Sequence, residues 1–156
     1  MNRKKLLLIV AHMPSKNTRR MAEQVLAGAS HVDIESVAAV LKSPFDTTPE
    51  DVIQCQGIIL GTTENLGYMS GALKDFFDRI YYPCLEVKQG LPFGVYIRAG
   101  HDGTGSSRAI NTIITGLKWR QAHELVLCRG DYQESFLDEC HDLGMTMAAS
   151  MDAGII

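Results

Sequence analysis

The sequence predicts a three-layer α/β fold, in which a five-stranded parallel sheet is covered by helices on both faces. Short apolar runs alternate with stretches of helical periodicity along the 156 residues. The run 57–61 is apolar throughout, as expected of a central parallel strand. Parallel strands need crossover connections, so this alternation favours a doubly wound sheet. We expect a single domain over residues 1–156.

Each expected strand is a short apolar run, and each expected helix carries apolar residues on one face. The strands are expected at residues 6–10, 32–37, 57–61, 93–97 and 124–127. Four long helices are expected at residues 18–29, 70–81, 106–117 and 134–151. A short helix is expected to follow Thr48, because a hydroxyl, a proline and an acid three residues after the hydroxyl are typical of a capped helix start.

Composition excludes several classes of protein. A formal net charge of -3 does not favour nucleic-acid binding, which relies on clustered Lys and Arg. No apolar stretch approaches the ~20 residues of a membrane helix. The four cysteines are widely spaced, without a metal-ligand pattern, so we expect no metal site and reduced thiols. With no secretion signal recognised, a cytoplasmic location is expected.

Sheets of this kind bind ligands beyond the carboxyl ends of their strands, which directs attention to three loops. The first, residues 13–18, opens a helix with Ser15 and Thr18. A helix N-terminus with hydroxyls favours an anion such as phosphate, but the same hydroxyls can simply cap the helix. The motif of an ATP-binding or GTP-binding P-loop is absent.

The second and third loops follow the third and fourth strands. Residues 61–71 are eleven residues rich in Gly, Thr and Asn, more than a strand-to-helix connection needs. Residues 99–106 contain three glycines, which allow a close backbone approach to a ligand. Each loop alone is consistent with a plain connection, but three at one sheet edge favour a binding site.

Two motifs carry a resemblance to flavodoxin-like FMN proteins. Residues 15–18, Ser-Lys-Asn-Thr, resemble the (S/T)-G-N-T phosphate loop of that family. Residues 67–79 resemble the G-x-M-S-G-x-x-K-x-F-x-D-R stretch of the quinone-reductase and FMN-reductase relatives. The resemblance extends over nearly the whole chain and implies the strand order 2-1-3-4-5.

The resemblance implies bound FMN, with its phosphate on the first loop and its ring between the other two. The implied cofactor-binding residues are Met13, Pro14, Ser15, Lys16, Asn17, Thr18, Thr62, Thr63, Glu64, Asn65, Leu66, Gly67, Tyr68, Ala99, Gly100, His101 and Gly103. His101 is also a candidate proton donor to a substrate, although a loop histidine is often only solvated. Met13 and Lys16 replace a hydroxyl and a glycine of the family pattern.

These observations lead to three hypotheses for function. The first is an FMN-dependent oxidoreductase that passes hydride from NAD(P)H to a quinone or a similar small acceptor. The second is a flavodoxin-type electron carrier, against which the mild net charge weighs. The third is a binding protein of the same fold with weakened FMN affinity, in line with Met13 and Lys16. The family resemblance further implies a homodimer or a higher homo-oligomer.

Overall fold

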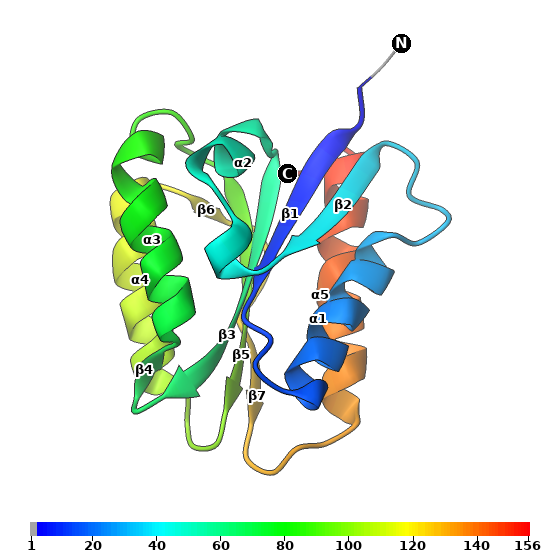
Figure 1. Cartoon of the computed structure of the whole chain (residues 1–156). Coiled ribbons are helices and arrows are strands. Elements are labelled where there is room, and N and C mark those ends of the chain that lie inside the picture. Colours follow the sequence, from blue (N-terminus) through cyan, green and yellow to red (C-terminus); the bar gives the residue numbers. More distant parts are fainter. Residues whose placement is uncertain (1–2) are drawn as a thin grey trace.

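A mostly parallel sheet runs through the middle of the molecule, with helices on both faces (Figure 1). The computed structural model describes residues 3–156. The strands are β1 (Lys5–Ala11), β2 (Val37–Lys42), β3 (Gly57–Asn65), β4 (Tyr68–Met69), β5 (Pro92–Ala99), β6 (Arg120–Gln121) and β7 (Val126–Arg129). The helices are α1 (Lys16–Ala29), the 3-10 turn η1 (Pro44–Asp46), α2 (Pro49–Gln54), α3 (Gly71–Cys84), α4 (Thr104–Leu117) and α5 (Ser135–Asp152).

The order of the strands is β2-β1-β3-β5-β6, and β7 also pairs with β5. All of these pairings are parallel, and only the short β4 runs antiparallel, against the end of β3. Strand β7 overlaps the fifth predicted strand, residues 124–127, and the short β6 lies before it and was not predicted. The predicted α/β fold and the order 2-1-3-4-5 are therefore confirmed.

The second predicted strand was placed too early in the sequence. Residues 32–37 were expected, whereas β2 is Val37–Lys42. The earlier segment is a turn, in which the N–H of Ile34 donates to the carbonyl of His31 at 2.9 Å and the N–H of Asp33 donates to the His31 ring at 3.1 Å. Val32 is 85% exposed. The apolar–polar alternation that suggested a strand therefore belongs to a turn closed by its own side chains.

Local hydrogen bonds precede strand β7, which begins later than the fifth predicted strand. The side-chain amide of Gln121 donates to the carbonyl of His123 at 3.1 Å, and the His123 ring lies 2.7 Å from the carbonyl of Glu124. Such side-chain to backbone bonds compete with pairing in a sheet. As a result β7 begins only at Val126, later than the predicted Glu124.

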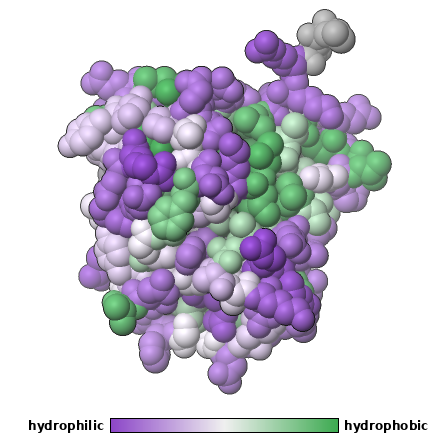
Figure 2. Space-filling model, viewed as in Figure 1, coloured by the Kyte–Doolittle hydropathy of each residue, from purple (hydrophilic) through white to green (hydrophobic). Residues whose placement is uncertain are grey.

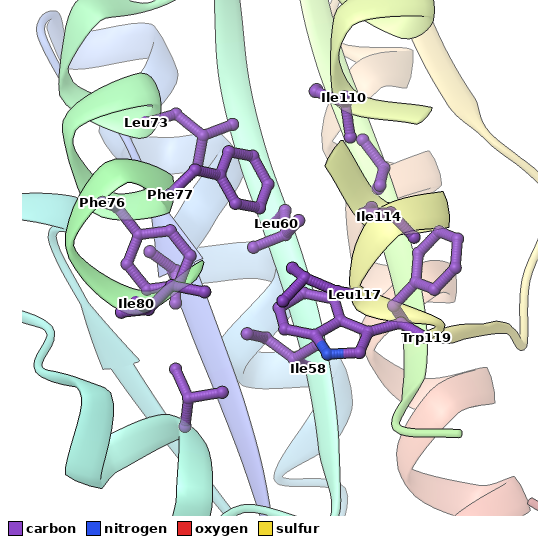
Figure 3. Close-up of a cluster of buried hydrophobic side chains, with 14 of the residues drawn as sticks. Ile58, Leu60, Leu73, Phe76, Phe77, Ile80, Ile110, Ile114, Leu117 and Trp119 are labelled. Carbon is purple, nitrogen blue, oxygen red and sulfur yellow. The ribbon is translucent and has the colours of Figure 1, made fainter. Parts of the chain in front are cut away.

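Two apolar cores lie on opposite faces of the sheet. One packs the sheet against α2, α3 and α4, where Phe76 and Phe77 from α3 meet Ile114 and Leu117 from α4 and the indole of Trp119 (Figure 3). The other packs the sheet against α1 and α5, which lie side by side (Figure 1). Helices α3 and α4 on one face and α1 and α5 on the other are thereby packed against the strands of the sheet.

The surface is largely hydrophilic on the face drawn in Figure 2, with an apolar area over the edge strand β2. Within this area Val40 is 37% exposed, and its neighbours Ala38, Ala39 and Leu41 are partly exposed. Among residues 3–156, the helices are all too short or too polar to cross a membrane.

Candidate functional site

The loops after β1, β3 and β5 lie together at the carboxyl edge of the sheet, the lower edge in Figure 1. Hydrogen bonds join them in pairs. The N–H of His12 donates to the carbonyl of Gly61 at 3.0 Å, and the N–H of Ser106 donates to the Glu64 carboxylate at 3.3 Å. The three predicted loops are therefore direct neighbours in space.

The first loop ends in a helix cap. The Ser15 hydroxyl accepts from the N–H of Thr18 at 3.2 Å, and the Thr18 hydroxyl accepts from the N–H of Ser15 at 2.9 Å. This reciprocal cap leaves the N–H groups of Lys16 and Asn17 without a partner among the described residues. The interpretation of these hydroxyls as a helix cap is therefore confirmed, and the end of the helix still offers two free N–H donors to an anion.

The charges around this loop favour an anion as well. Lys16 is exposed beside the free N–H groups, whereas Arg20 is held by Glu134 at 2.8 Å. The partly buried Met13 side chain packs against the α1/α5 core. Pro14 is exposed at the tip of the loop. Burial lowers the pKa of His12, which therefore adds no charge here near neutral pH.

The second loop is largely a β-hairpin, and the expectation of an eleven-residue irregular loop was wrong. Strand β3 continues through Thr62, Thr63 and Glu64 to Asn65, and then turns back into β4. The turn is formed by Leu66 and Gly67, with φ of 54° and 74°. Two positive φ values in succession are typical of a tight turn that matches the twist of a hairpin.

The base of this hairpin is buried and the tip is exposed. The Thr62 hydroxyl donates to the carbonyl of Thr63 at 2.8 Å and accepts from the N–H of Ser70 at 3.0 Å. The Thr62 hydroxyl is therefore already bonded within the hairpin and is buried. At the tip the side chain of Leu66 is fully exposed, and Tyr68 is 41% exposed. Leu66 and Tyr68 are the hairpin's apolar side chains open to a ligand.

Most residues of the motif over 67–79 stabilise helix α3 and do not lie at the edge of the sheet. The Ser70 hydroxyl caps the helix by accepting from the N–H of Leu73 at 3.1 Å. Lys74 and Asp78 form an ion pair, and Arg79 pairs with Asp75. The Arg79 guanidinium also donates to the carbonyls of Pro44, the first residue of η1, and of Thr47, which directly follows η1, each at 2.7 Å. These residues fasten α3 to the β2–α2 connection.

The third loop passes into α4 through a glycine. Gly103 has a φ of 72° and supplies no side-chain cap, so Asp102 accepts from the N–H of Thr104 at 3.0 Å instead. That hydrogen bond lowers the pKa of Asp102. Gly100 and His101 are exposed, and the side chain of Ala99 is buried in the α3/α4 core. The catalytic role of His101 stays a prediction.

A fourth segment at this edge, the loop between β7 and α5, was not among the predicted loops. The Glu134 carboxylate in this loop accepts hydrogen bonds from both terminal nitrogens of the Arg20 guanidinium, and this pair ties α5 to α1. The Arg98 guanidinium lies 5.2 Å from the ring centre of Phe136, and Tyr132 packs edge-on against that ring. The expected strand order could have predicted this loop at the edge, because the fifth strand of a parallel sheet ends at the same edge as the others.

A cavity of about 750 Å³ extends from the third loop along α4 and β7. Asp102, Arg108 and Asn111 from the loop and the helix form one side, and Leu125 and Leu127 form the other. The cavity is open to solvent and adjoins the candidate site at Asp102 and Gly103 of the third loop.

Solved structures share this fold. A flavodoxin from the domain Archaea superposes with a TM-score of 0.78 at 18% identity, over 93% of this chain and 97% of that one. The chain has a flavodoxin-like fold. The flavodoxin, WrbA-like protein from Agrobacterium tumefaciens superposes with a TM-score of 0.74 at 18% identity, over 97% of this chain and 99% of that one.

The sequence of the chain is also similar to that of a flavodoxin. The flavodoxin of Aquifex aeolicus (strain VF5) is 30% identical to it over 111 residues, which are 71% of this chain. The chain spans 59% of the length of that flavodoxin. No family model matches the chain. In this flavodoxin-fold protein the first, second and third loops meet at the predicted edge of the sheet.

Proposed function

We propose that this flavodoxin-fold protein binds FMN at the carboxyl edge of its sheet and transfers electrons. The observation that carries the proposal is the open N-terminus of α1, where the N–H groups of Lys16 and Asn17 have no partner among the described residues. The similarity to a flavodoxin supports the same conclusion. FMN, when bound, supplies the redox chemistry, and the protein binds and orients it.

The residues present fit the phosphate of FMN. A 14-residue helix directs its positive end at the first loop, and two backbone donors and the Lys16 ammonium are available there. The Ser15–Thr18 cap fixes the backbone that presents those donors. Lys16 thereby compensates for the hydroxyl that Met13 does not provide.

The other two loops fit a flat heterocycle. Leu66 and Tyr68 offer apolar surface at the hairpin tip, and Gly67 has no side chain to hinder a close approach. Gly100 is exposed across the edge, next to His101. We expect the ring to lie against these residues, where backbone groups and apolar side chains are both present.

A second candidate function is reduction of a quinone or similar acceptor with NAD(P)H as the donor. The similarity of residues 67–79 to the quinone-reductase motif and the fold of the WrbA-like protein favour it. His101, exposed at the edge, is the residue we expect to donate a proton to the acceptor. A homodimer in the cytoplasm belongs to the same proposal.

The decisive experiment is reconstitution with FMN followed by titration of flavin fluorescence. Saturable quenching with one FMN per chain is expected, and its absence would favour a binding protein that has lost the flavin. With FMN bound, consumption of NADH or NADPH in the presence of a quinone supports the reductase. Binding without that turnover, together with electron transfer between a reductase and an acceptor protein, supports the carrier.

A further inference from the structure

The hairpin of the second loop is attached to helix α4 through Glu64. The N-cap residue of α4, Gly103, has no side chain that could accept a hydrogen bond from the first turn. The Glu64 carboxylate takes that place from another element and accepts from the N–H of Ser106 at 3.3 Å. A carboxylate is also stabilised at this end of a helix by the helix dipole.

A second contact holds the tip of the hairpin on the same helix turn. A Cβ atom on Gly105 would lie 1.7 Å from the carbonyl oxygen of Gly67. The turn of the hairpin therefore rests directly on the backbone of α4, and Ser106 beneath it has no exposed surface. The side chain at residue 64 and the absence of one at residue 105 together fix where the hairpin lies.

The base of the hairpin is held in place by buried hydrogen bonds. Thr62 of β3 and Ser70, which directly follows β4, are buried and bonded to each other. The paired segment beyond them consists only of Glu64 with Met69 and Asn65 with Tyr68. A hairpin this short is marginally stable alone, so its position depends on the contacts with α4.

We infer that Glu64 is a positioning residue for the flavin ring. It holds Leu66 and Tyr68 at a fixed distance from the third loop, and so sets the separation of the two segments that flank the ring. Its own carboxylate binds α4, not the cofactor. This inference rests on the proposed function, because it assigns the role within the proposed FMN site.

The test compares Glu64→Gln with Glu64→Ala. A glutamine keeps a side-chain oxygen that can accept from the N–H of Ser106, whereas alanine removes it. In the FMN-free protein we expect the amides of Ser106 and of the hairpin to exchange hydrogen about tenfold faster in E64A and near the wild-type rate in E64Q. FMN is expected to bind E64A about tenfold more weakly and E64Q within about twofold of wild type.

A matched control is Glu50→Ala. Glu50 is also a glutamate that accepts one hydrogen bond, from Gln54 at 2.9 Å, but it lies in α2 and is exposed. FMN affinity and hairpin exchange should not change in E50A. Unchanged exchange in E64A, or unchanged FMN affinity despite faster exchange, overturns the inference while the proposed function stands. A wild-type protein that does not bind FMN overturns the proposed function and the positioning role together.

Discussion

Helices α1 and α5 touch through two glycines, which makes their contact sensitive to a single methyl group. A Cβ atom on Gly144 would lie 2.0 Å from the carbonyl oxygen of Val25, and one on Gly28 would lie 2.0 Å from that of His141. Both distances are far below van der Waals contact. The substitution Gly144→Ala therefore forces the two helix backbones apart.

Two opposing effects determine the free energy of unfolding of G144A. Alanine in a helix interior is favoured over glycine by about 1 kcal/mol. Overpacking costs about 1–3 kcal/mol, and the upper end applies because the methyl group meets backbone that no side-chain rotation can remove. We expect a net loss of about 2 kcal/mol, which lowers the melting temperature by about 4–8 °C for a domain of this size.

Urea denaturation followed by circular dichroism measures this loss. The control is Gly71→Ala in the first turn of α3, where a Cβ atom would meet nothing within 4 Å. G71A is expected to be as stable as wild type or slightly more stable. If G144A and G71A unfold at the same urea concentration, the close contact between α1 and α5 is refuted.

Three further predictions concern charge and burial. Lys16→Ala should weaken FMN binding about three- to tenfold at low salt, with a smaller effect in high salt, as measured by flavin fluorescence. Hydrogen bonds from Ser36 hold the pKa of the Asp152 carboxyl below its usual 3.8. The stabilisation of the fold by these bonds is therefore present above that pH and is lost as the pH falls through the folded-state pKa. The substitution D152N should remove this part of the acid sensitivity, as measured by urea titrations at several pH values. All four cysteines are free and buried, so Ellman's reagent at roughly pH 8 should label them only after unfolding.

The fold could be predicted because its signals are local and repeated. Apolar runs such as 57–61 and the capped helix start at Thr48 each report on their own segment. The second strand was misplaced because residues 32–37 alternate like a strand but close a turn through His31. The late start of the last strand accompanies hydrogen bonds of Gln121 and His123 with the nearby backbone, which no periodicity reveals.

The candidate site was only partly predictable. The three loops were expected at one edge because parallel strands place their carboxyl ends together. The hairpin was missed because its turn residues, Leu66 and Gly67, are not the Asn-Gly or Asp-Gly pair that marks such turns. The bond from Glu64 to α4 joins residues 42 positions apart, so only the folded chain shows it.

The N-termini of α1 and α4 both lie at this edge, and they differ in one respect that bears on where a phosphate can bind. At α4 the protein supplies its own carboxylates, because Asp102 and Glu64 accept from the first turn. A phosphate there would meet two negative charges and fewer free donors. At α1 the cap is made of neutral hydroxyls, and the first turn contains no acid but a lysine. The same dipole is therefore neutralised at α4 and left open at α1, and the phosphate of FMN is expected at α1 rather than at α4.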